Sequence, residues 1–217
     1  MKILVFSCDL NKDLWYPFNH CMEKYWKGHP EVVYKTERIK NHYYRTISKD
    51  YPLEKWSRGI REALKEIEDE FVLFIADDCF IRRKVDVKRI SEAEEFLREH
   101  PKAACINFER SFDDKDEGID FKRRQKGSLY EVSLMCGLWR KDALIDILEG
   151  DMSPWDIELR NDSKDWDIYI NGGDFIIDWG YETWHYAGIM RGKWCREAKY
   201  FFDNEGIKID YEKRGFA

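Results

Sequence analysis

An apolar run that ends on two adjacent carboxylates constrains the fold of this chain more than any other feature of its sequence. Residues 71–81 read Phe-Val-Leu-Phe-Ile-Ala-Asp-Asp-Cys-Phe-Ile. The short apolar part, 71–76, predicts a buried strand, and a buried negative charge is costly unless a cation meets it. Ligands of α/β sheets bind beyond the carboxyl ends of the strands. The run therefore predicts an α/β sheet with a charged ligand at the end of this strand.

The acid pair, Asp77 and Asp78, is a candidate metal site. Hard divalent ions such as Mg²⁺ and Mn²⁺ prefer carboxylate oxygens and bind together with phosphates. Successive strand side chains point to opposite faces, so we expect Asp78 to hold the ion and Asp77 to act through water or a ribose hydroxyl. The alternative is a pair that caps a turn or binds Arg82 and Arg83. The position at a strand end favours a metal-dependent enzyme that acts on a phosphate-bearing substrate.

Strand and helix patterns alternate along the chain. We expect strands at 2–8, 31–36, 71–76, 103–108, 130–139 and 175–179, and helices at 15–26, 53–70, 91–100, 141–149, from 154 and at 194–204. The polar residues 38–52 are expected to be a loop. The order implies a mainly parallel central sheet flanked by helices, with a mixed second half, in a single domain of 217 residues.

Composition excludes some classes of protein. A net charge of −6 argues against a dedicated nucleic-acid binder. The six cysteines form no C-x-x-C pair, so a zinc knuckle is not expected. We expect reduced thiols in a cytoplasmic protein. No apolar run approaches the length of a membrane span, which also favours a cytoplasmic location.

The segment Ser-Pro-Trp-Asp-Ile-Glu at 153–158 carries two candidate general bases. A carboxylate near a helix start can take a proton from a substrate hydroxyl. Ser153 and Asp156 also have the spacing of a capping box, which gives Asp156 a structural explanation. Glu158 is the better candidate base, because capping does not account for it.

Residues 185–194 combine cations, glycines and one histidine. Arg191 and Lys193 can fold over an anionic leaving group, and the glycines at 188 and 192 favour mobility. The alternative for both cations is an ordinary solvated surface. His185 can complete a metal site or make a structural hydrogen bond. Among nine tryptophans, Trp155 and Trp184 are the candidates for stacking on a sugar ring, against core packing for the rest.

Three common phosphate and hydrolase motifs are missing. The chain has no G-x-x-x-x-G-K-[ST] loop, no G-x-G-x-x-G after its first strand and no G-x-S-x-G elbow. Ordinary NTPases, dinucleotide-dependent oxidoreductases and α/β-hydrolases are therefore disfavoured.

Taken together, these pieces resemble a GT-A fold glycosyltransferase, of the small bacterial or phage-borne kind that builds surface polysaccharides. The resemblance rests on four stretches: 2–8, 56–78, 138–158 and 185–194. It implies that residues 1–100 bind a nucleotide-sugar and that 101–217 bind a glycan or other hydroxyl acceptor.

The resemblance also implies roles for residues. The acid pair matches the D-x-D element of that family in shortened form, since Ala76 stands at the earlier acid position. Asp78 then carries most of the Mn²⁺ or Mg²⁺ binding. Cys8, Glu37, Arg58 and Asp77 are expected at the nucleotide, Arg191 and Lys193 at the diphosphate, and Glu158 or Asp156 at the base position.

Other readings stay open. A nucleotidyltransferase would share the sheet and the metal, but would carry a glycine-rich basic segment where Asp9-Leu10-Asn11-Lys12 stands. A non-catalytic protein that binds nucleotide-sugars or glycans fits the shortened acid motif. A transferase that modifies DNA is a narrower variant, which the acidic balance disfavours. The sequence does not indicate the oligomeric state.

Overall fold

The computed structural model describes residues 1–110, 121–179 and 188–217. They form two compact units. Unit 1 comprises Met1–Asp9, Pro30–Ala76 and Asp86–Ile176, and unit 2 comprises Leu10–His29, Asp77–Val85 and Ile177–Ala217.

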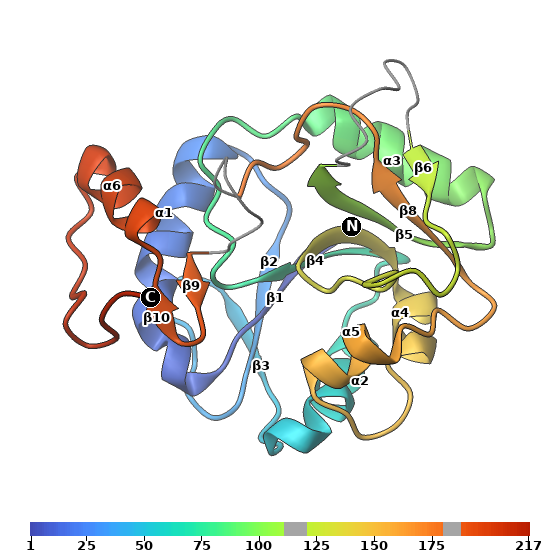
Figure 1. Ribbon diagram of the computed structural model, residues 1–217, viewed down its shortest axis with the longest axis horizontal. Helices are drawn as coiled ribbons and strands as arrows, with labels where there is room; N and C mark the ends of the chain where they lie inside the picture. Colours follow the sequence, from blue (N-terminus) through green and yellow to red (C-terminus); the bar gives the residue numbers. More distant parts are fainter. Residues whose placement is uncertain (111–120, 180–187) are drawn as a thin grey trace. The chain divides into compact units, whose positions relative to one another are not determined.

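Unit 1 is built on a mixed sheet that has eight strands within the described residues (Figure 1). Its strands are β1 (Lys2–Phe6), β2 (Val32–Thr36), β3 (Arg45–Ser48), β4 (Phe71–Ala76), β5 (Ala103–Arg110), β6 (Phe121–Arg123), β7 (Cys136–Arg140) and β8 (Asp167–Asn171). Their order across the sheet is β3-β2-β1-β4-β7-β5-β8-β6. The first four strands are parallel, whereas β7 runs antiparallel to both β4 and β5. The expected fold class, a mainly parallel sheet with a mixed second half, is confirmed.

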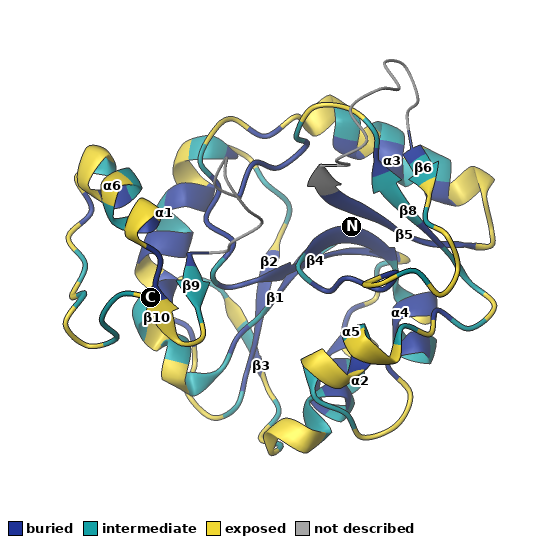
Figure 2. Cartoon of the chain, viewed as in Figure 1, coloured by how far each residue is buried: buried dark blue, intermediate teal, exposed yellow. Residues whose placement is uncertain are grey.

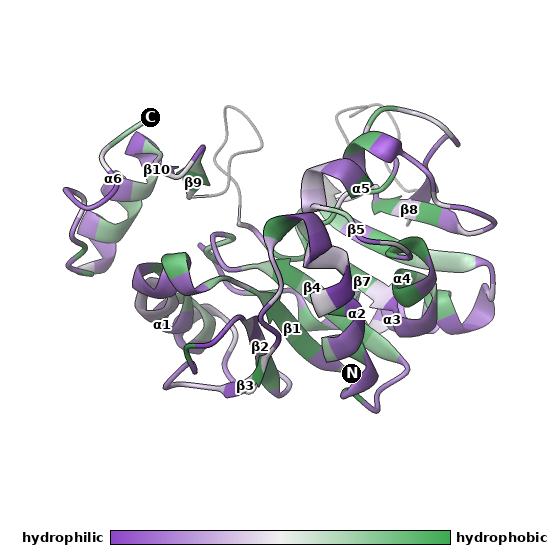
Figure 3. Cartoon of the chain, turned by 90° about the horizontal axis from the view of Figure 1, so that it is seen from below, coloured by the Kyte–Doolittle hydropathy of each residue, from purple (hydrophilic) through white to green (hydrophobic). Residues whose placement is uncertain are grey.

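Helices α2 (Trp56–Lys65), α4 (Lys141–Ile147) and α5 (Pro154–Arg160) bury their apolar residues against one face of this sheet. The stripe Ile60, Ala63 and Leu64 of α2 meets Leu4 and Phe74 in this core. Each fully buried side chain of that size stabilises the fold by about 1.5–3 kcal/mol. α3 (Val87–Glu99) packs on β5 and β7. Figure 2 shows β4 as buried along its length and β1 as buried between its two end residues, and Figure 3 shows the two strands as mainly hydrophobic.

Three parallel strands of unit 1 end at the same sheet edge. Phe6 of β1 is level with Lys35 of β2 on one side and with Ala76 of β4 on the other. Because Asp77 follows Ala76 directly, the acid pair leaves the sheet at this carboxyl edge. The edge is where ligands of α/β sheets bind.

Some expected elements differ from the structure. β3 lies inside the expected loop 38–52, and β8 was not expected; only Ile47 of β3 is buried, so it lacks a continuous apolar run. The expected strand at 130–139 begins only at Cys136, and residues 175–179 form no strand. The helix at 53–70 is a short 3₁₀ turn, Leu53–Lys55, followed by α2.

Unit 2 contains the 3₁₀ turn Asp9–Leu14 (from Leu10 on), α1 (Trp15–Tyr25), the hairpin β9 (Ile189–Met190) and β10 (Lys193–Trp194), and α6 (Arg196–Glu205). Phe80 packs on Phe202 and Trp194, with ring centroids 4.9 and 6.0 Å apart. Lys24 and Tyr25 of α1 bind Glu205 of α6 at 2.6 and 2.7 Å. Aromatic packing and one shared carboxylate therefore join the elements of this unit.

Two further expectations can be compared with the described residues. All six cysteines are unbridged thiols, and all but the half-buried Cys8 are buried. Within the described part of the chain, no helix has both the length and the apolar character that crossing a bilayer requires.

Candidate active site

The acid pair has one carboxylate fixed by a neighbour and one without such a contact. Asp77 is buried, and its Oδ1 accepts a hydrogen bond of 3.1 Å from Nδ2 of Asn11. Asp78 is half-buried, and its side chain makes no ion pair or hydrogen bond with another residue of the described segments. The two carboxylates therefore differ, since only that of Asp77 has a side-chain partner that the described segments show. Arg82 and Arg83, the alternative partners, form ion pairs with Asp178 at 2.7 and 3.0 Å.

A cation that sequence reasoning missed lies behind the pair. Arg214 donates through Nη2 to Oδ1 of Asn11 at 3.0 Å, so Asn11 bridges Arg214 to Asp77. The same guanidinium binds Asp13 at 2.7 and 2.8 Å, and Lys213 binds that carboxylate at 2.8 Å. The adjacent cations Lys213 and Arg214 were the available signal, but nothing in the sequence places the segment near residue 77.

The environment of Asp78 favours a bound cation. Burial raises the pKa of Asp78 to about 7, although its own main-chain amide and the charge of Arg214 favour ionisation. A nearby positive ion would stabilise the charged form. Because carboxylate oxygen is a preferred ligand of Mg²⁺ and Mn²⁺, Asp78 fits such an ion. The described residues hold no group of three His, Cys, Asp or Glu side chains suited to a metal. Substrate oxygens and water would therefore complete the coordination.

The basic segment near the C-terminus is a β-hairpin whose turn is Arg191-Gly192. Both turn residues have positive φ, 51° and 80°, as a two-residue hairpin turn of type I′ requires. Arg191 and Lys193 are exposed. The expected mobility is not the reason for Gly188: a Cβ there would lie 2.2 Å from the Phe80 ring. Gly188 donates its N–H to the carbonyl of Asp78 at 2.8 Å, which ties this segment to the acid pair. His185 lies outside the described residues.

In unit 1, Cys8 and Glu37 flank the carboxyl edge of β1 and β2. Oε2 of Glu37 accepts the N–H of Asp9 at 2.8 Å, and the Asp9 carboxylate accepts the N–H groups of Arg38 and Ile39. These bonds lock the two loops together. Lys35, which sequence reasoning also passed over, is buried two residues before Glu37.

Arg58 of α2 is engaged with another residue of unit 1. Its guanidinium binds Asp151 through two bonds of 2.9 and 2.7 Å and lies 5.8 Å from the centre of the Tyr51 ring. This ion pair is partly exposed. Exposed pairs contribute about 0–1 kcal/mol, so a ligand can exchange with Asp151 at small cost.

The two candidate bases have different contacts. Asp156 forms the expected capping box with Ser153, and the Ser153 hydroxyl holds the pKa of Asp156 below its usual range. Oε1 of the half-buried Glu158 accepts the N–H of Leu134 at 2.9 Å. Trp155, next to them on α5, is 60% exposed, so its ring face is accessible. Trp184 lies outside the described residues.

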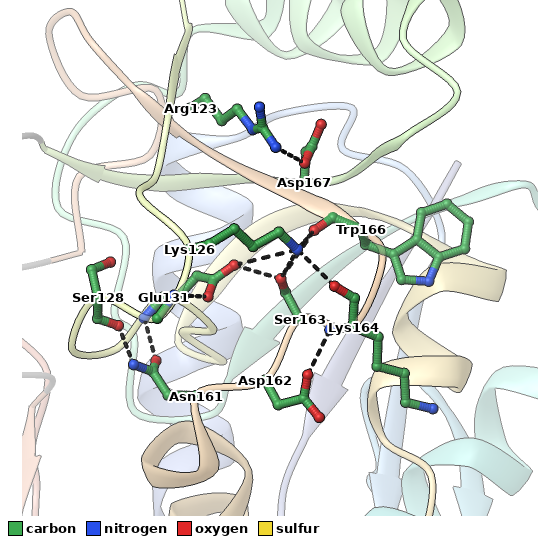
Figure 4. A network of polar contacts seen from close by, with 11 residues as sticks. Arg123, Lys126, Ser128, Glu131, Asn161, Asp162, Ser163, Lys164, Trp166 and Asp167 are labelled. Carbon is green, nitrogen blue, oxygen red and sulfur yellow. Dashed lines mark hydrogen bonds and ion pairs between the residues drawn. The ribbon is translucent and has the colours of Figure 1, made fainter.

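A lysine, a serine and a carboxylate also meet in unit 1, in the polar network of Figure 4. Lys126 contacts Ser163 and two main-chain carbonyls, and Ser163 binds Glu131. Ser163 and Glu131 are 2% and 1% exposed. Such a set can activate a nucleophile, but burial closes it to a substrate. It instead joins loop 124–131 to loop 161–166.

Comparison with known proteins gives distant structural similarity. No protein-family model and no curated protein matches the sequence. Similar solved structures include the bifunctional IspDF from Campylobacter jejuni, at 13% identity and a TM-score of 0.45 over 80% of this chain. S. aureus TarS is similar at 16% sequence identity and a TM-score of 0.48, over 81% of this chain. CMP:2-keto-3-deoxy-manno-octonic acid synthetase complexed with CTP is similar at 10% sequence identity and a TM-score of 0.47, over 79% of this chain.

The matched share of these proteins varies. The chain spans 50% of IspDF and 35% of TarS, but 88% of the synthetase. Identities and TM-scores this low assign the chain to no family. Its function has to be inferred from its own residues.

Proposed function

We propose that this protein is a metal-dependent glycosyltransferase that moves a sugar from a nucleotide-sugar to a hydroxyl of a glycan or other acceptor. The observation that carries the proposal is the state of Asp78: a half-buried carboxylate, with no ion pair among the described residues, directly after a central parallel strand. A divalent ion with its attached diphosphate meets the needs of such a group. A cytoplasmic location is part of the same proposal.

The residues divide the chemistry as follows. Glu158 takes the proton of the acceptor hydroxyl, and that oxygen forms a bond to the anomeric carbon. The bond between this carbon and the phosphate oxygen breaks, and its electron pair leaves on the nucleoside diphosphate. Asp78 would hold Mn²⁺ or Mg²⁺, and the ion would supply positive charge against the leaving group. Arg191 and Lys193 contribute further positive charge. Cys8, Glu37, Arg58 and Asp77 contact the nucleotide, and Trp155 stacks on the acceptor sugar.

A nucleotidyl transfer is disfavoured by the segment after β1. Residues Asp9–Leu14 form a 3₁₀ turn with two acids and one lysine, not a glycine-rich basic loop around a triphosphate. The two reactions also release different products: a nucleoside diphosphate from glycosyl transfer and pyrophosphate from nucleotidyl transfer.

The test is product release by wild type and by Asp78→Asn, with a panel of nucleotide-sugars and Mn²⁺. We expect wild type to release nucleoside diphosphate and the variant to lose at least about 100-fold in rate, which corresponds to about 2.7 kcal/mol of transition-state stabilisation. Asp165→Asn, at an exposed carboxylate, is the matched control and should keep full activity. Release of pyrophosphate, or full activity of Asp78→Asn, would overturn the proposal.

A further inference from the structure

Lys35 of unit 1 is a buried lysine to which the described residues offer no hydrogen-bond or ion-pair partner. The residue is 2% exposed, and its ammonium group has no hydrogen bond and no ion pair among the described residues. Burial accordingly lowers the pKa of Lys35. Buried lysines are normally paired, because a desolvated charge without hydrogen bonds is costly. An ammonium group at the end of a buried side chain, with no acceptor among the described residues, can donate to an acceptor supplied from outside the chain.

The carboxylates around Lys35 are occupied elsewhere. Glu37 binds the N–H of Asp9, and Asp9 binds two main-chain N–H groups after β2. Asp50 forms an ion pair with Arg38 at 3.3 Å. These groups attract Lys35 through space, but none of them is an ion-pair partner. They leave the surroundings negative, which disfavours a phosphate and favours a neutral acceptor.

Helix α2 leaves room at the end of the Lys35 side chain. A Cβ at Gly59 would lie 3.2 Å from Cε and 3.4 Å from Nζ of Lys35, and 3.4 Å from the Tyr51 ring. Glycine in the middle of a helix is unfavourable. Gly59 weakens helix α2, and Lys35 is a buried cation beside it. Neither residue is explained by its contribution to the stability of the fold. Such conflicts with local rules are expected at functional sites.

This point lies next to the carboxyl edge of the sheet. Lys35 is level with Phe6, and Phe6, Cys8 and Tyr51 are half-buried. Phe6 beside Lys35 in the sheet and Tyr51 beside Gly59 thus supply aromatic side chains to this part of the edge, and aromatic rings can stack on a planar base.

We propose that Lys35 selects the nucleotide by donating a hydrogen bond to a carbonyl oxygen of its base. The inference rests on the proposed function, and it adds the class of donor: nucleotides of uracil, thymine, cytosine or guanine, and not of adenine, the one common base without a carbonyl. A site built around a hydrogen bond rejects an analogue that leaves the buried donor unpaired.

The test is the binding of UDP, CDP, GDP and ADP, measured by calorimetry with Mn²⁺ present. We expect at least one of the first three to bind wild type ten-fold or more tightly than ADP. Lys35→Met should reduce that preference to within about threefold, mainly by weakening the favoured nucleotide, because methionine has a similar shape but no donor. Lys65→Met, at an exposed position of α2, should leave both affinities unchanged.

A second variant protects the test against a folding defect in Lys35→Met. Gly59→Ala keeps the lysine but presses on its Cε, so it should also reduce the preference. If the preference for the favoured nucleotide survives in both variants, the inference is wrong while the proposed function stands. If wild type binds none of the four nucleotides, the proposed function fails and the inference fails with it.

Discussion

Asp156 and Glu158 lie two residues apart on α5, yet their contacts give them different tasks. In the capping box, the Asp156 carboxylate accepts the main-chain N–H and the hydroxyl of Ser153 at the helix start. Glu158 reaches a different segment, since its Oε1 accepts the N–H of Leu134 just before β7. The contact with Leu134 positions the carboxylate, and a carboxylate can accept a proton.

The first prediction separates these roles. Glu158→Gln keeps a carbonyl oxygen for the Leu134 N–H, so it should fold normally, bind donor like wild type and lose at least about tenfold in turnover, a typical share for a general base. Asp156→Asn weakens the capping box and should lower the midpoint of urea unfolding slightly, with turnover retained. Both are read from steady-state kinetics and urea unfolding. Loss of donor binding in Glu158→Gln, with turnover retained, would refute the assignment of the base.

The second prediction concerns the dependence of stability on pH. Burial opposes ionisation of Asp13, but hydrogen bonds from Arg214 and Lys213 outweigh it and lower the pKa from 3.8 to about 2. A lowered pKa stabilises the fold above the ordinary value of 3.8, and this contribution is lost as the pH falls towards 2.

Asp13→Asn should therefore lower the free energy of unfolding by about 1–2 kcal/mol at neutral pH, after allowance for solvent screening. The difference from wild type should shrink as the pH falls from 3.8 towards 2. Urea unfolding across that range measures it, with Asp165→Asn as the control. A difference that does not change with pH would contradict the ion-pair account.

At the scale of single residues, local signals were sufficient for some predictions and not for others. The capping box follows from the spacing of Ser153 and Asp156. The different environments of Asp77 and Asp78 do not follow from strand alternation, because both residues stand in a turn after β4. Arg214 could not be predicted, because its contacts with residues 10–13 join segments about two hundred positions apart. Lys35 was passed over because a lysine at the end of a strand is normally exposed.

At the scale of elements, the hairpin β9–β10 stores backbone strain in its turn. Arg191 has φ of 51°, a conformation that asparagine or glycine adopts more readily. A residue type that is unfavourable in this turn but positively charged agrees with a role in binding.

The third prediction uses this conflict. Arg191→Asn should raise the free energy of unfolding by about 0.5–1 kcal/mol through relief of strain, while weakening donor binding by about tenfold through loss of a charge-assisted hydrogen bond. Arg191→Lys is the control: it keeps both charge and strain, so stability and most of the affinity should stay. Thermal unfolding and calorimetry measure the two effects. Unchanged donor affinity in Arg191→Asn would place Arg191 outside the site.

Continuous apolar runs made β1, β2 and β4 predictable, and helical spacing did the same for α2. β3 and β8 lack that signal, since their burial depends on neighbours in the sheet and not on an apolar run. The hairpin was missed because its strands are two residues each, too short for alternation to show.

At the scale of the whole molecule, the alternation of strands and helices was enough to predict a parallel sheet. The antiparallel insertion of β7 between β4 and β5 was not predictable, because residues 136–140 pair with strands that precede them by thirty or more positions. The order of strands is decided by such long-range pairing and leaves no local trace.

The fourth prediction concerns linkage between ligand binding and stability. A ligand present at 100 times its Kd stabilises the fold by about 2.7 kcal/mol. Mn²⁺ together with a bound nucleoside diphosphate should therefore raise the melting temperature of wild type more than the nucleotide does with EDTA. Asp78→Asn should lose the increment due to the metal. Differential scanning calorimetry measures the shift, and an equal metal increment in both proteins would argue against Asp78 as a ligand.

The uneven burial of the thiols offers a way to follow these events. Five cysteines are buried, and only Cys8, at the carboxyl end of β1, is half-buried. A maleimide dye added to the native protein should therefore attach first at Cys8, without any engineered cysteine. The fluorophore would then report from the same sheet edge at which the base of the nucleotide is proposed to bind.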